Sequence, residues 1–122
     1  MKSFIIDIEI YDSKVHVLYD ATDEEFSRYM FDNFKVKKDR LQTSAACWLI
    51  TSGNGVTRLV DFRTKLKQDA YSVNTIVHES DHVAFEMMKE LSIPYVYETT
   101  DEVHCYLCAF IAGKIYEEVF KK

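Results

Sequence analysis

The chain has 122 residues, with 20 Asp and Glu against 15 Lys and Arg, and its formal net charge is −5. This length suits one domain spanning residues 1–122, and a content of 48% apolar and 14% aromatic residues argues against disorder. The acidic balance disfavours a nucleic-acid partner, and no apolar run approaches the roughly 20 residues that a membrane span needs. Early charges argue against a signal peptide, and the three cysteines make an odd count that fits reduced thiols. We therefore expect a cytoplasmic protein.

The first third of the chain predicts a hairpin followed by a helix. Residues 4–11 begin apolar and then alternate, residues 12–14 supply a turn, and residues 15–20 alternate again. Thr22 and Glu25 have the spacing of a capping box, which predicts a helix over about residues 23–34. Its apolar side chains recur at helical spacing and are expected in the core: Phe26, Tyr29, Met30 and Phe34. The basic run 35–40 is expected to be a solvated connector.

The middle and the end of the chain predict a second hairpin and two helices. Residues 46–51 and 56–62 are β-prone and flank a turn signal at 52–55, and the charged connection 63–70 is expected to be irregular. An apolar stripe predicts a helix ended by Ser92, Ile93 and Pro94; its members are Val73, Ile76, Val77, Ser80, Ala84, Met87, Met88 and Leu91. Residues 95–97 are expected to form a short extended segment. Thr99 or Thr100 is expected to cap a last helix that runs to about Phe120. This order predicts an α+β fold, with an antiparallel sheet of about four strands packed with three helices.

One motif inside the predicted helix carries candidate chemistry. His78, Glu79, Ser80, Asp81 and His82 form an H-E-x-x-H sequence. Residues four apart lie about 40° from each other around a helix, so both imidazoles can reach one metal ion. Glu79 projects to the flank of the pair, where a carboxylate can act as a general base on water.

Glu102 is the candidate third ligand. It stands 20 residues after His82, near the start of the last helix, and a hairpin of helices would return it over the motif. Tyr106 lies one turn further on and is a candidate hydrogen-bond partner behind the ligand, while the small residues Ala109 and Gly113 let this face approach another helix. The alternative is that Glu102 only caps the helix, because Thr99 and Glu102 also match a capping box.

At these residues the chain resembles the gluzincin branch of the zincin metallopeptidases, and in particular short H-E-x-x-H proteins of phage genomes. The resemblance implies a zincin-like fold and one Zn²⁺ per chain on His78, His82 and Glu102, with water in the fourth position. It implies that Glu79 takes a proton from that water and delivers it to the leaving amine of a peptide or protein substrate, which lies along an edge strand of the 46–62 hairpin. If the chain is phage-encoded, its location would be the host cytoplasm.

Several alternatives stay open at this stage. Asp81 places a charge where such motifs have an uncharged residue, which leaves room for a catalytically weak or inactive metal-binding interaction domain. A metal-free interaction module is a third possibility. The residue that stabilises the oxyanion is not assigned among the tyrosines Tyr71, Tyr95, Tyr97 and Tyr106.

Other metal-binding residue types are expected to have no part in the site. The C-x-x-C of Cys105 and Cys108, next to His104, lacks a second pair to complete four ligands, so buried helical cysteines are the simpler interpretation. His104 points about 160° away from Glu102 around the helix. His16 is expected at the surface.

Overall fold

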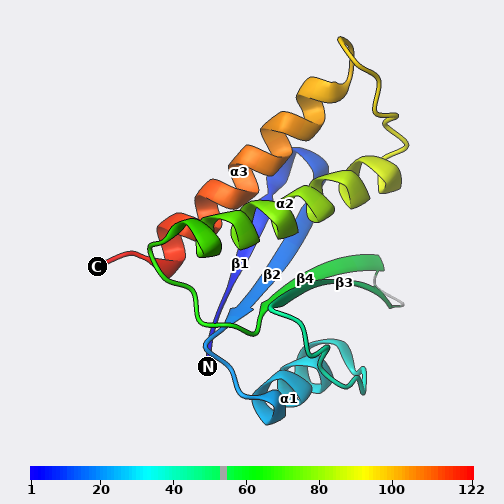
Figure 1. Cartoon of the computed structure of the whole chain (residues 1–122). Helices are drawn as coiled ribbons and strands as arrows, with labels where there is room; N and C mark the ends of the chain where they lie inside the picture. Colours follow the sequence, from blue (N-terminus) through cyan, green and yellow to red (C-terminus); the bar gives the residue numbers. More distant parts are fainter. Residues whose placement is uncertain (53–54) are drawn as a thin grey trace. The chain divides into compact units, whose positions relative to one another are not determined.

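The computed structural model describes residues 1–52 and 55–122, which form two compact units, Met1–Leu66 and Lys67–Lys122. The first unit contains a four-stranded sheet and one helix, and the second contains two helices (Figure 1). The expected α+β class, with three helices, is confirmed. That residues 1–122 form one zincin-like domain stays a prediction.

The sheet is built from the two predicted hairpins. The first consists of β1 (Lys2–Ile8), a short 3₁₀ turn, η1 (Glu9–Tyr11), and β2 (Ser13–Tyr19). The second consists of β3 (Ala45–Ser52) and β4 (Gly55–Phe62), and its predicted turn falls partly on residues 53–54, outside the described residues. The strand order is β1-β2-β4-β3, so β1 and β3 are the edge strands.

The expectation of a purely antiparallel sheet is wrong at its centre. Both hairpins are antiparallel, but β2 pairs with β4 in parallel, with Val17 opposite Val60. The chain between these two strands passes through a helix and then through β3 at the outer edge, so that β4 runs in the same direction as β2. The sheet is therefore mixed. Two strands joined by a tight turn must be antiparallel, whereas the long connection between β2 and β4 allows them to pair in parallel.

The helix α1 (Asp23–Phe34) packs on the sheet of its own unit. Its capping box is present as predicted: Glu25 N–H donates to the Thr22 hydroxyl, and Thr22 N–H donates to the Glu25 carboxylate. The helix ends at Lys35, which adopts the left-handed conformation. The buried cluster between helix and sheet consists of Leu18, Phe26, Tyr29, Met30, Ile50 and Leu59, with Phe34 and Trp48 packed against it.

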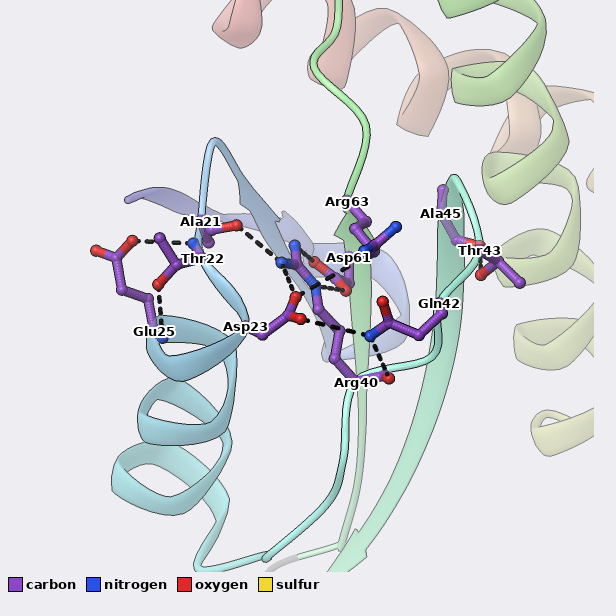
Figure 2. A network of polar contacts seen from close by, with 10 residues as sticks. All are labelled: Ala21, Thr22, Asp23, Glu25, Arg40, Gln42, Thr43, Ala45, Asp61 and Arg63. Atoms are coloured by element: carbon purple, nitrogen blue, oxygen red, sulfur yellow. Dashed lines mark hydrogen bonds and ion pairs between the residues drawn. The ribbon is translucent and has the colours of Figure 1, made fainter.

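A buried ion pair corrects the prediction of a fully solvated connector over residues 35–40. Arg40 lies in the loop before β3, and its guanidinium donates two hydrogen bonds of 2.8 Å to the Asp61 carboxylate on β4 (Figure 2). A third nitrogen donates to the carbonyl of Ala21 at 2.8 Å and to Asp23 at 3.1 Å. Both side chains of the central pair are 2% exposed, so Arg40 fastens this loop to the sheet and to the start of α1.

The second unit is a helical hairpin. The helix α2 (Ala70–Glu90) begins at Asp69, whose carboxylate accepts a hydrogen bond from Ser72 N–H, and α3 (Asp101–Val119) runs back along it (Figure 1). The connection 91–100 contains no strand, and Tyr97 lies in a turn, so the extended segment expected at 95–97 does not reach Tyr97. None of the helices in the described part of the chain is long and apolar enough to span a membrane.

Candidate metal site

The two motif histidines converge on one side of α2. Nε2 of His78 and Nε2 of His82 are 3.2 Å apart, and both side chains are exposed. Two nitrogens bound to one tetrahedral zinc ion, each at 2.0–2.1 Å, lie about 3.3 Å apart. The pair therefore already has the nitrogen separation that a shared metal ion requires, as the i, i+4 spacing predicts.

Glu79 lies next to the pair but is more deeply buried than a flanking position suggests. Glu79 is only 5% exposed. Its Oε2 atom is buried and has no hydrogen-bond partner among the described residues. Burial raises the pKa of the Glu79 carboxyl above its usual value, and the charges of His78 and His82 oppose this effect. A buried carboxylate oxygen without a partner is uncommon and favours a role for the carboxyl beyond stability.

The burial of Glu79 follows from a rotation of the apolar stripe on α2. Val73 and Val77, which were expected in the stripe, are exposed, whereas Ser72 and Val83 are buried. The buried stripe therefore runs on the side of the helix that includes Glu79. The predicted members Ile76, Ser80, Ala84, Met87 and Met88 are buried, and the core face is turned by only about 40° from the predicted one.

Glu102 lies in the first turn of α3 with its side chain exposed. The capping alternative is wrong, because Thr100 is the N-cap residue and no side chain makes a cap hydrogen bond. The hydroxyl of Thr99 instead donates to the carbonyl of Val96, and the hydroxyl of Thr100 accepts from the N–H of Val96. The Glu102 carboxylate is thus not used as a helix cap.

The face of α3 that meets α2 is opposite to Glu102. The buried residues of α3 are Leu107, Ile111 and Ile115, and Cys108 Sγ lies 4.0 Å from the carbonyl of Val77 on α2. Tyr106, the candidate partner behind the ligand, is 72% exposed on the outer side with Glu102. The expectation that this outer face approaches the motif helix is therefore not met, and the structure does not bring Glu102 to the two histidines.

A contact that sequence reasoning missed joins the motif to α3. Oδ1 of Asp81 lies 2.6 Å from Nε2 of His104, an ion pair when the imidazole is protonated. The His104 ring stacks on Phe85 with centroids 4.0 Å apart, and Tyr95 closes the cluster at 5.4 Å from Phe85 and 5.6 Å from His104. The signal available in the sequence was the shared helical face of His104 with Leu107, Cys108, Ile111 and Ile115.

The remaining candidate residues are spread over the surface of the second unit. Tyr71, Tyr95 and Tyr97 are all exposed, as is Tyr106, and their positions do not single one out as an oxyanion donor. Cys105 is exposed and Cys108 is half-buried, and burial raises the pKa of the Cys108 thiol, which disfavours the thiolate that a metal or redox site needs. Across residues 1–52 and 55–122, no three His, Cys, Asp or Glu side chains are grouped to hold a metal ion.

Comparisons of this chain with protein-family models, with curated proteins and with solved structures found no match. The case for its function therefore rests on the geometry of α2 and on the chemistry of the side chains around it.

Proposed function

We propose that the chain is a zinc-dependent metallopeptidase in which His78 and His82 bind the ion and Glu79 is the general base. The observation that carries the proposal is the 3.2 Å separation of the two Nε2 atoms, which fits two ligands of one tetrahedral zinc. Two exposed imidazoles on one helix face also need little rearrangement to receive the ion.

The state of Glu79 supports its assigned role. A zinc ion lowers the pKa of a nearby water to about 7, so that a neighbouring base can remove its proton. A carboxyl whose pKa is raised by burial is a stronger base than an exposed one, and its buried Oε2 has no hydrogen-bond partner among the described residues, so a shift of the side chain toward the histidines would let it accept that proton. Glu79 would then return the proton to the leaving nitrogen of the peptide.

Glu102 remains the proposed third ligand. Its carboxylate is exposed and is not held in a cap, so it is available for coordination. To reach the histidines, the first turn of α3 must present the opposite face to α2, which requires the contact between Asp81 and His104 to open. The proposal therefore includes a rearrangement of α3 when zinc binds.

The test combines metal content with peptidase activity in matched variants. Glu79→Gln keeps the shape of the side chain and should retain zinc while cleavage of a peptide library falls at least about 100-fold, the usual effect of losing a general base. Glu90→Gln makes the same change at the end of the same helix and should behave as the wild type. Undiminished cleavage by Glu79→Gln would remove Glu79 from the mechanism.

A second candidate function is a metal-binding domain without hydrolysis. It is favoured by the placement of Glu102 on the outer face of α3, which leaves two histidines as the grouped ligands among the described residues. This alternative predicts bound zinc and a higher melting temperature with zinc, but no cleavage of any peptide in the library. Cleavage that depends on Glu79 would exclude it.

A further inference from the structure

The start of α3 is fastened to the motif helix by a small cluster of side chains. Oδ1 of Asp81 on α2 lies 2.6 Å from Nε2 of His104 on α3, and the His104 ring stacks on Phe85, one turn further along α2, with centroids 4.0 Å apart. Tyr95, from the connection between the helices, packs its ring 5.6 Å from that of His104. The His104 side chain is only 12% exposed as a result, so it is anchored by residues of α2 and of the connection.

This anchoring decides which face of α3 meets α2. Glu102 precedes His104 by two residues, which places the two side chains about 160° apart around the helix. When His104 faces Asp81, Glu102 must point away from α2, and its side chain is exposed there. The contact between His104 and Asp81 and the coordination of zinc by Glu102 are therefore mutually exclusive arrangements of the same helical turn.

The rest of α3 is held by different contacts. Its buried residues are Leu107, Ile111 and Ile115, which all follow His104 along the helix. The start of the helix has no side-chain cap within the described part of the chain, and Glu102 lies in that first turn. Uncapped helix ends open locally at a low cost in free energy, without unfolding of the packed remainder. Loss of the contact with Asp81 can thus free the first turn while the apolar contacts of α3 stay in place.

We propose that the contact between Asp81 and His104 is an autoinhibitory latch, which withholds Glu102 from the zinc site until the contact opens. The proposal rests on the proposed zinc site and adds how that site is regulated. Because Asp81 directly precedes the ligand His82, the segment that binds zinc also carries one half of the latch. The latch must open before zinc gains its third ligand, so the apparent affinity is lower than the same three ligands would give without the contact.

Zinc affinity in Asp81→Asn tests the latch. The variant keeps the shape of the side chain and removes the charge that attracts His104, so zinc should bind more tightly than to the wild type, by up to about fivefold, the upper range for one partly exposed ion pair. By charge alone, removal of a carboxylate near a cation weakens binding, so tighter binding cannot come from that effect. Competition with a chromophoric chelator measures the dissociation constants. Glu117→Gln, at the exposed far end of α3, is the matched control and should bind zinc as the wild type does.

The gain in affinity should act through Glu102. In a chain that carries Glu102→Ala, the further change Asp81→Asn frees a turn that has no ligand to offer, so zinc should bind no more tightly than to Glu102→Ala alone. An equal gain in both backgrounds would overturn the latch, because the effect of Asp81 would then not depend on the third ligand.

Amide hydrogen exchange of the metal-free protein tests the contact itself. The amides of residues 105–108 donate to carbonyls in the first turn of α3, and their exchange should be faster, by up to about fivefold, in Asp81→Asn and in His104→Phe, which keeps a ring against Phe85. The amides of residues 111–118 should exchange as in the wild type. Unchanged exchange at residues 105–108 in both variants would show that the contact does not hold the start of α3, and the latch would be excluded.

The outcomes separate the latch from the zinc site. If the wild type binds zinc as tightly as Asp81→Asn does, the latch is excluded and the zinc site stands. If neither the wild type nor any variant binds zinc, the proposed function is excluded, and the latch falls with it because it has no site to regulate.

Discussion

His16 illustrates how its neighbours change the behaviour of a single residue. It was expected at the surface, but it is half-buried on β2, with Nδ1 2.7 Å from the Tyr29 hydroxyl and its ring 5.0 Å from that of Phe34. Burial lowers the pKa of His16 below 6.5, and the charge of Lys14 adds to this effect. The folded state therefore favours the neutral imidazole.

This shift predicts a pH dependence of stability. Because the folded pKa of His16 is below the unfolded value, its stabilising contribution is complete above about pH 6.5 and is lost as the pH falls toward the folded pKa. We expect this loss in the free energy of unfolding to begin as the pH falls below about 6.5, and to be smaller in His16→Gln. Urea unfolding at each pH measures both curves, and parallel curves would show that His16 does not contribute.

At the same scale, the candidate site shows what residue spacing predicts well and what it does not. The separation of His78 and His82 follows from the geometry of one helix, so a stretch of five residues was enough to predict it. The positions of Glu79 and Glu102 depend on which side of each helix is buried, and this is decided by packing along the whole helix. Apolar residues on several sides of α3, including Tyr106 and Phe110, hid its buried face from the sequence pattern.

At the scale of elements, the ion pair of Arg40 and Asp61 joins three segments that local patterns treat separately. It links the loop before β3 to β4 and, through Ala21 and Asp23, to the start of α1 (Figure 2). Burying the guanidinium of Arg40 is tolerated because four of its contacts are to oxygen atoms. The prediction for residues 35–40 used only the charges within that segment, so it placed Arg40 in solvent and could not include its partner on β4.

Removing one partner of this pair should be strongly destabilising. Asp61→Ala leaves the Arg40 charge buried without its main partner, and we expect the free energy of unfolding to fall by about 3–5 kcal/mol. Urea unfolding followed by circular dichroism measures this loss. Asp23→Ala, at the exposed carboxylate that also contacts Arg40, is the matched control and should have a much smaller effect. Equal losses in the two variants would contradict the importance assigned to the buried pair.

The sheet also shows that short sequence signals predict local elements but not the pairing of distant strands. Alternation and turn residues predicted both hairpins, and the capping box predicted where α1 begins, because each of these signals lies within a few residues. The parallel pairing of Val17 with Val60 joins residues more than forty positions apart, and neither hairpin carries a signal for it. The order of strands was therefore the part of the fold that sequence patterns could not supply.

At the scale of the whole molecule, the proposed zinc site draws on both helices of one helical hairpin. Its two histidines lie on the exposed side of α2, and its proposed third ligand, Glu102, lies on the outer face of α3. The three ligands come together only if the start of α3 turns toward α2.

Zinc content is the most direct test of the central claim. The wild type, His82→Ala, Glu102→Ala and the control His16→Gln are each incubated with zinc, dialysed and analysed for metal per chain. The account predicts one zinc ion in the wild type and in His16→Gln, none in His82→Ala, and a reduced content in Glu102→Ala. A wild type without zinc, or a His82→Ala variant that holds as much zinc as the wild type, would contradict it.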